Sequence, residues 1–392
     1  MNSSQKIRVG MVISTYYPVW GGVQRQLDQI GEYLRDEGVD LFILTRKLPK
    51  TSFFELKNQT PVFRIPVTNI SKRLDSFLFI SLSVIWLLKN KSKFDILHCY
   101  QMYSPTTIGA FVKKIIPSKK IVVKVTSSNE YGEAKEIKKL PFYNIRSKLL
   151  KIVDKFFVVN KKIIHELSEL DIPAEKISYM PNGVCLPPDK LLCDSEKNSL
   201  KRSLNLPFDK IVIFTGRITE EKNLAKLLFS WQIVKNRCPQ AHLIMLGEGG
   251  RERNSLDAIN QLREKLRLTQ SVHLVGKINN VFDYLLSSDV FVLPSISEGL
   301  SNSLLEAMAA GLGIVAADND GNRQAITDER NGILVNAQNV ESISSAIIKL
   351  IEDDDHRKLL GIEARKTAIK DFSMKKIAGE YACSYRELLL NK

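Results

Sequence analysis

Short runs of apolar, mostly β-branched residues alternate along the chain with longer stretches in which apolar positions recur at helical spacing. This alternation is typical of a parallel α/β fold, because parallel strands need a crossover helix between them. The apolar runs predict buried strands at residues 7–14, 41–45, 96–99, 121–126 and 156–159. The amphipathic stretches between them predict helices at about residues 23–37, 76–89, 106–116 and 161–170.

The same pattern restarts at residue 210, after Pro187, Pro188 and a polar stretch that interrupt regular structure. Strands are predicted at residues 210–215, 243–246, 273–275, 290–293 and 314–316, with a helix from about residue 222 and a last one at about 374–390. Each series begins with a strand that ends in a glycine loop. The sequence therefore predicts two Rossmann-like, doubly wound domains, residues 1–188 and 189–373, with ligands bound in a cleft at the carboxyl ends of their strands.

Composition narrows the class of protein. A chain of 392 residues with 44% hydrophobic residues can bury two sizeable cores. The five cysteines are scattered and include no C-x-x-C pair, which favours a reducing compartment. The first eight residues do not resemble a secretory signal, and the longest apolar stretch, residues 77–88, is interrupted by serines. A cytoplasmic location is expected.

The positive charge is concentrated in the first half. The chain carries 57 Lys and Arg against 43 Asp and Glu, and residues 1–188 hold 29 of the former and 16 of the latter. This asymmetry favours an anionic partner for the N-terminal half: a membrane surface, a phosphorylated substrate or nucleic acid. The alternative is that surface lysines only keep the protein soluble.

Two glycine loops are candidates for phosphate binding. Gly21 and Gly22 follow the first strand and precede a helix, where backbone N–H groups and the helix dipole attract anions; a simple tight turn explains them equally well. The segment GRITEEKN, residues 216–223, is more specific. It places Arg217 and Lys222 between a strand and a helix, where two cations can hold a diphosphate without a metal. The alternative is a pair of surface cations.

Two carboxylates follow the strand at residues 290–293. Glu298 is predicted in the loop at its carboxyl end, and Glu306 in a short helix at about residues 302–310. Because carboxylates accept two hydrogen bonds from vicinal hydroxyls, the pair suits a ribose and a hexose. Alternatively, Glu306 only stabilises a helix N-terminus.

Other motifs carry less weight. GLGIVA, residues 311–316, has dinucleotide-fingerprint spacing but follows a helix and precedes a strand, the reverse of the motif's context. Gly247, in GEGG at residues 247–250, is placed to line a nucleotide pocket. Asp318 and Asp320 fall in a predicted turn, so no metal site is expected. His98 ends a strand, where a buried core histidine and a residue near a reacting centre are both compatible with its position.

Together, GGVQ (21–24), PNGV (181–184), GRITEEKN (216–223), LGEG (246–249) and SEGLSNSLLEAMAAG (297–311) resemble the retaining family 4 glycosyltransferases of GT-B fold. The resemblance covers nearly the whole chain. It implies that two Rossmann-like domains face a cleft, that the C-terminal one binds a nucleotide-sugar, and that the final helix, about 374–392, crosses back to the N-terminal domain.

The resemblance also implies residue roles. Gly21, Gly22 and Gly247 would line the donor site, and Arg217 with Lys222 would neutralise the diphosphate leaving group. Glu298 would contact the donor sugar and Glu306 the ribose. The backbone of Gly299, Leu300, Ser301 and Asn302 would close around sugar and phosphate.

The chain departs from the family at one position. Many members have a histidine after the strand that matches residues 122–126, but this chain reads TSSNEYG at residues 126–132. Asn129, Glu130 and His98 are candidates for the acceptor side or reacting centre by location alone.

The expected function is therefore a metal-independent, retaining glycosyltransferase without a cofactor. It would transfer a hexose, by default glucose from UDP-glucose, to a glycan or glycolipid acceptor in polysaccharide biosynthesis, at the cytoplasmic face of an anionic membrane. Two alternatives are an NAD-dependent sugar-nucleotide epimerase or dehydrogenase, which lacks its N-terminal G-x-G-x-x-G here, and a nucleic-acid-binding module, for which no motif is present.

Overall fold

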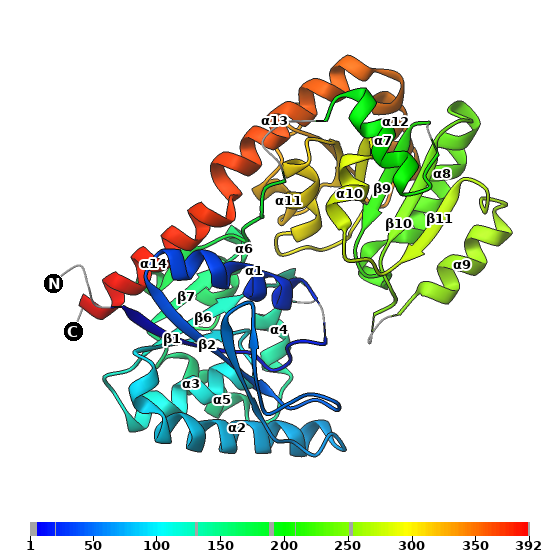
Figure 1. Cartoon of the computed structure of the whole chain (residues 1–392). Helices are drawn as coiled ribbons and strands as arrows, with labels where there is room; N and C mark the ends of the chain where they lie inside the picture. Colours follow the sequence, from blue (N-terminus) through cyan, green and yellow to red (C-terminus); the bar gives the residue numbers. More distant parts are fainter. Residues whose placement is uncertain are drawn as a thin grey trace. The chain divides into compact units, whose positions relative to one another are not determined.

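The computed structural model describes residues 6–19, 21–129, 132–187, 192–207, 209–250 and 254–390. The chain forms two compact units (Figure 1). The first, called the N-unit, comprises Met1–Gly183 with Met374–Lys392, and the second, the C-unit, comprises Val184–Ser373. The domain joint predicted at residue 188 lies outside the described residues.

The described part of the N-unit is built on an eight-stranded sheet with the order β3-β4-β2-β1-β5-β6-β7-β8. Its strand pairs are parallel except for the β3–β4 hairpin. The strands are β1 (Ile7–Val12), β2 (Val39–Arg46), β3 (Phe54–Lys57), β4 (Thr60–Ile65), β5 (Ile96–Tyr100), β6 (Lys120–Val125), β7 (Lys155–Val158) and β8 (Ile177–Tyr179).

Helices cover both faces of this sheet. In Figure 1, α1 and α14 lie on one face, and α2, α3 and α5 lie on the other; α1 packs on α14, and α3 packs on both α2 and α5. Parallel strands covered on both faces become apolar along their whole length, and β5 is buried throughout. The helices are α1 (Gly22–Asp36), α2 (Lys72–Lys89), α3 (Ser104–Ile115), α4 (Glu133–Lys138), α5 (Tyr143–Leu150), α6 (Lys161–Ser168) and α14 (Met374–Leu390).

The C-unit repeats the architecture with a six-stranded parallel sheet in its described residues, ordered β11-β10-β9-β12-β13-β14. Its strands are β9 (Ile211–Thr215), β10 (His242–Leu246), β11 (Val272–Gly276), β12 (Val290–Leu293), β13 (Gly313–Ala317) and β14 (Ile333–Val335). Its helices are α7 (Asp194–Ser203), α8 (Leu224–Arg237), α9 (Leu256–Lys265), α10 (Val281–Leu286), α11 (Asn302–Ala309), α12 (Val340–Glu352) and α13 (Asp354–Phe372). The predicted pair of doubly wound units is confirmed.

Strand order fixes where a ligand can bind. In each sheet the chain moves outward in both directions from a central pair of strands: β1 and β5 in the N-unit, β9 and β12 in the C-unit. The loops that leave such a pair diverge and open a crevice beyond the carboxyl ends of the strands. The loops after β9 and β12 carry Arg217, Lys222 and Glu298.

The structure shifts one predicted helix start and adds elements that the sequence did not predict. The helix expected from about residue 222 begins at Leu224, because Asn223 adopts a left-handed backbone (φ +57°) and ends the 3₁₀ turn Glu220–Lys222. The β3–β4 hairpin was not predicted, because β3 is a short edge strand whose side chains are only partly buried.

Candidate functional site

The centre of the candidate site is an ion pair between two loops at the carboxyl ends of the C-unit strands. Lys222 Nζ, from the loop after β9, lies 2.6 Å from Glu298 Oε1, from the loop after β12. The two side chains are only 14% and 11% exposed. Sequence reasoning placed both residues in the site but missed the pair, because 76 positions separate them.

Hydrogen bonds hold the two loops together. The side-chain amide of Asn223 donates to the carbonyl of Pro294 at 3.2 Å in the loop after β12, and to the carbonyl of Ala337 at 2.7 Å after β14. The Ile296 N–H donates to the carbonyl of Glu221 at 3.0 Å. Because the segments on both sides of the ion pair are fixed in this way, Lys222 and Glu298 are held at a defined separation.

Arg217 presents a second cation at the same strand end. Its side chain is 58% exposed, and Nη2 lies 3.6 Å from Glu221 Oε1. The Glu221 side chain is only 13% exposed, and its Oε2 is buried without a hydrogen-bond partner. The buried carboxylate of Glu221 thus orients Arg217, and the exposed part of the guanidinium remains able to bind an anion.

Gly247 lets the loops after β9 and β10 run in contact. Its φ is +147°, and a Cβ there would lie 1.8 Å from the carbonyl oxygen of Gly216. The Ile218 N–H donates to the Glu248 carbonyl at 2.9 Å, which continues the contact. Gly247 is therefore required by close backbone approach next to Arg217.

Glu306 lies in α11, which begins directly after the Glu298 loop. The helix is capped by Ser301, whose hydroxyl accepts from the Leu304 N–H at 3.5 Å. Glu306 is only 5% exposed, and the first turn of α11 contains no acidic residue. The alternative role of Glu306 as a charge at the helix N-terminus is therefore not supported.

The Asp-Asn-Asp sequence at 318–320 supports the Glu298 loop. The Asn319 amide donates to the Ser295 carbonyl at 2.9 Å, and a Cβ on Gly321 would lie 2.4 Å from the Glu298 carbonyl oxygen. Asp318 is paired with Arg323. Within the described ranges, no cluster of three or more His, Cys, Asp or Glu has the geometry of a metal site.

In the N-unit, Gly21 and Gly22 open α1 at the carboxyl end of β1. Gly21 is the extended N-cap residue, and α1 has no side-chain cap. A helix N-terminus at the switch point of a parallel sheet attracts anions. This placement agrees with a phosphate contact but equally with the tight turn considered above.

His98 is fully buried on the sheet face that packs against α14. Its Nδ1 lies 2.6 Å from the Tyr385 hydroxyl, and its ring stacks on Tyr100 with centroids 4.7 Å apart. Burial lowers the pKa of His98 well below its usual range. These surroundings favour the core-histidine interpretation over a role near a reacting centre.

Asn129 lies in the loop after β6 with a left-handed backbone, φ +64°. Its N–H donates to Glu166 Oε1 at 2.7 Å, so the loop is tied to α6. Glu130 lies outside the described residues. Nothing in this geometry assigns Asn129 a chemical role.

Sequence reasoning missed Glu133, a fully buried carboxylate at the start of α4. Its oxygens accept from the N–H groups of Met102 and Thr126, both at 2.7 Å, and from the Thr126 hydroxyl at 2.8 Å. Burial raises the pKa of Glu133 to about 7 although these hydrogen bonds oppose the shift. Glu133 joins the loops after β5 and β6. In the sequence, the only feature that could have indicated a role for Glu133 is its position after a glycine at the start of a helix.

Two protein-family models match consecutive parts of the chain. "Glycosyltransferase Family 4" matches residues 20–186, and "Glycosyl transferases group 1" matches residues 196–367. The chain is a GT-B glycosyltransferase.

Individual relatives agree with this assignment. The UDP-Gal:α-D-GlcNAc-diphosphoundecaprenol α-1,3-galactosyltransferase of Escherichia coli is 26% identical, with all of both chains covered. An N-acetylgalactosaminyltransferase of Campylobacter jejuni, named for a diphospho-undecaprenol substrate, is 33% identical over 43% of this chain and 45% of its own. The structure of Anabaena HepE with UDP and glucose superposes with a TM-score of 0.79 at 17% identity, covering 97% of this chain and 99% of the other.

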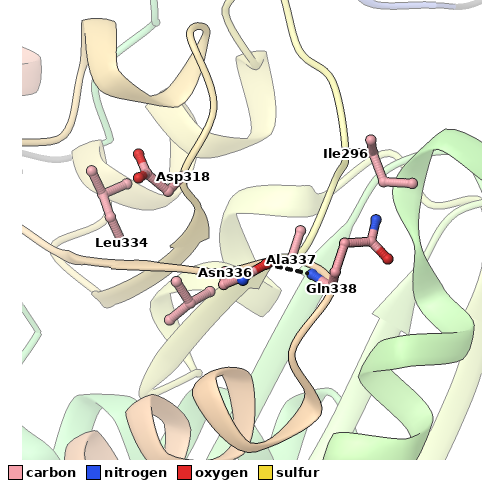
Figure 2. Close-up of a pocket in the computed structure, with 7 residues that line it drawn as sticks. Ile296, Asp318, Leu334, Asn336, Ala337 and Gln338 are labelled. Carbon is pink, nitrogen blue, oxygen red and sulfur yellow. Dashed lines mark hydrogen bonds between the residues drawn. The ribbon is translucent and has the colours of Figure 1, made fainter.

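The glycosyltransferase also has a hollow next to the Glu298 loop (Figure 2). This pocket of about 380 Å³ is lined by Ile296, Asp318 and residues 334–338, and the Gln338 N–H donates to Asn336 Oδ1 at its wall. None of the predicted site residues lines it. The alternative functions, an epimerase or dehydrogenase and a nucleic-acid-binding module, are not favoured by the comparisons.

Proposed function

We propose that this glycosyltransferase transfers a hexose from a UDP-linked sugar to a lipid-linked glycan acceptor, with retention of the anomeric configuration. The observation that carries the proposal is the position of Arg217, Lys222 and Glu298 at the switch point of the C-unit sheet. Two cations and a carboxylate meet where an α/β sheet binds its ligand.

These groups suit the departure of a nucleoside diphosphate. When the bond between the sugar C1 and the diphosphate oxygen breaks, negative charge develops on that oxygen. The Lys222 ammonium has three N–H donors, so it can keep its bond to Glu298 and still donate to the diphosphate. Arg217 adds a guanidinium whose fork matches phosphate oxygens. Two preorganised cations can take the place of a metal ion.

The remaining donor contacts follow from the same frame. Residues 299–302 lead into α11, whose N-terminal N–H groups are proposed to donate to oxygens of the donor. Glu298 is proposed to contact the hexose, Glu306 the ribose, and Gly247 to let the backbone approach the donor closely. Gly21 and Gly22 are proposed as a further phosphate contact.

The names of relatives support the donor and acceptor classes. The Escherichia coli relative is named for UDP-galactose and a diphosphoundecaprenol acceptor, and the HepE structure holds UDP and glucose. Galactose and glucose are both hexoses, and we propose glucose as the sugar that this chain transfers. A lipid-linked acceptor agrees with an enzyme that acts at the cytoplasmic face of an anionic membrane. The basic N-terminal half is suited to contact such a surface.

The test is a panel of nucleotide sugars incubated with a polyprenyl-diphosphate-linked sugar acceptor, with products read by mass spectrometry and anomeric configuration by NMR. We expect transfer from a UDP-hexose, retention, and full activity in EDTA. Arg217→Ala and Lys222→Ala should each lower kcat about 10²- to 10³-fold, the cost of losing one preorganised donor to developing charge.

Arg237→Ala is the matched control, because Arg237 forms an exposed pair with Glu352 on the C-unit surface. It should leave kcat unchanged. Reversible loss of activity on chelation would overturn the metal-independent mechanism. Inversion of the anomeric configuration would overturn the assignment as a retaining enzyme.

A further inference from the structure

Helix α2 is apolar on the side that faces away from the N-unit. Its inner side buries Phe79 and Leu87 against the unit. Its outer side presents Leu74, Phe77 and Ile85, which are 44%, 66% and 49% exposed. A surface helix normally carries polar residues on its outward side, so three large apolar residues there indicate contact with a second apolar phase.

Two neighbouring helices extend this surface. Helix α2 packs on α3, and α3 packs on α5, on the same face of the sheet (Figure 1). Ile115 at the end of α3 is 58% exposed, and Phe142 and Ile145 at the start of α5 are 76% and 55% exposed. We call these residues the apolar face: Leu74, Phe77, Ile85, Ile115, Phe142 and Ile145.

Exposed basic side chains flank the apolar residues along the chain. Arg73 lies at the start of α2, Lys89, Lys91 and Lys93 lie at and beyond its end, and Lys148 lies on α5. The acidic residue of α2, Asp75, is buried and accepts hydrogen bonds from the Thr68 hydroxyl and the Asn69 N–H. No acidic residue occurs between positions 137 and 153. The border of the apolar face is therefore positively charged.

We propose that the apolar face docks on an anionic lipid bilayer. Its aromatic and aliphatic side chains enter the boundary between headgroups and acyl chains, and the basic border contacts lipid phosphates. Charge complementarity selects this occupant: a second copy of the chain would bring two positive borders together. None of the described helices is long and apolar enough to cross a membrane. In the proposed complex, α2 lies along the membrane surface.

The proposed function places a membrane contact at the N-terminal half, and this inference identifies its surface. To that extent it rests on the proposed function. The test is cosedimentation of the full chain with phosphatidylcholine vesicles, with and without phosphatidylglycerol. We expect binding only with phosphatidylglycerol, weakening steeply as salt rises.

The double variant Phe77→Ser/Ile85→Ser should lower the partition coefficient by ~10-fold or more, because two exposed apolar side chains no longer enter the lipid. Lys89→Glu/Lys91→Glu/Lys93→Glu should abolish the preference for phosphatidylglycerol. The matched control is Leu359→Ser, an exposed apolar side chain on α13 of the C-unit, which should bind like the wild type. All substitutions are at exposed positions, and equal melting temperatures verify folding.

Vesicle binding that is absent, or unchanged in the Phe77→Ser/Ile85→Ser variant, overturns the docking proposal. A dimer in gel filtration that this variant dissociates would overturn it in favour of a second copy. Transfer to a short, water-soluble acceptor is measured in parallel. If that transfer persists while vesicle binding fails, the docking proposal fails alone and the proposed function stands.

Discussion

Glu298 and Glu306 lie close together along the chain but in different surroundings. Glu298 is in an ion pair with Lys222 in the loop after β12, whereas Glu306 is buried in α11. The first position suits a group that meets the reacting sugar, and the second suits one that holds a part of the donor that does not react. Their removal should therefore affect different kinetic constants.

We predict that Glu306→Gln raises KM for the donor by ~10-fold with little change in kcat, because uniform binding of an unreactive ribose is lost. Glu298→Gln should mainly lower kcat, by roughly 10-fold or more, because the contact changes as the anomeric bond breaks. Steady-state kinetics and calorimetric affinity for UDP distinguish the two. If Glu298→Gln weakens UDP binding and Glu306→Gln does not, the two roles are reversed.

Lys124 is a second residue whose surroundings determine its behaviour. It is 2% exposed in β6, and its ammonium lies 5.2 Å from the centre of the Tyr381 ring of α14. Burial lowers the pKa of Lys124 from 10.5 to about 7. Between these two values the unfolded chain holds a proton that the folded chain lacks, so the free energy of unfolding rises with pH across this window.

We predict that Lys124→Met removes this rise, a slope of roughly 1 kcal/mol per pH unit, and raises stability at pH 7 by on the order of 1–4 kcal/mol. Chemical denaturation at several values between pH 7 and 10 measures both effects. Lys375→Met, at an exposed position on α14, is the control and should keep the wild-type pH dependence. An unaltered slope in Lys124→Met would show that another group titrates.

At the scale of elements, the site depends on loops that touch backbone to backbone. The loops after β9 and β10 meet at Gly247 and Gly216, and the loops after β9 and β12 meet through the backbone hydrogen bond from Ile296 to Glu221 and the side chain of Asn223. The strands place the loop ends, and these contacts set the positions of Arg217, Lys222 and Glu298. A change in one loop should therefore affect its neighbour.

Gly247→Ala tests this coupling. The added Cβ would meet the Gly216 carbonyl oxygen at 1.8 Å on a backbone with φ +147°, so we expect a loss of about 2–4 kcal/mol in stability, together with a lower kcat from displaced Arg217. Gly276→Ala is the matched control: its φ is +84°, but no atom lies within 4 Å of the new Cβ. It should cost only about 1 kcal/mol. Thermal melts and kinetics of both variants measure the difference. Equal costs would exclude the steric contact as the cause.

At the scale of the whole molecule, the two units differ in their net charge, and the apolar face belongs to one of them. The excess of positive charge lies in residues 1–188, and the apolar face belongs to the helices α2, α3 and α5 of the N-unit. The paired cation and carboxylate of the candidate site belong to the C-unit. The proposed work is divided accordingly, with membrane contact on the N-unit and donor chemistry on the C-unit.

The sequence by itself determined the class of fold and the neighbourhood of the site. Buried strands such as β9 and β12 are continuous apolar runs because helices cover both faces of a parallel sheet, and this pattern is local enough to be visible in the chain. Because the ends of these strands could be predicted, the positions of the loops that follow them could be predicted as well. Helix α14 was predicted from Met374 to Leu390 as it occurs.

Only the tertiary structure decided which of these residues meet. The Lys222–Glu298 pair, the burial of His98 beneath α14 and the hydrogen bonds of Glu133 all join positions distant in the chain or in different elements, and no local pattern encodes them. The outward side of α2 is a similar case: its apolar residues predict a helix, but whether they enter the core or remain exposed depends on which elements pack against it. Local sequence fixes periodicity and turn chemistry, whereas contacts between distant segments arise only when strand order brings them together.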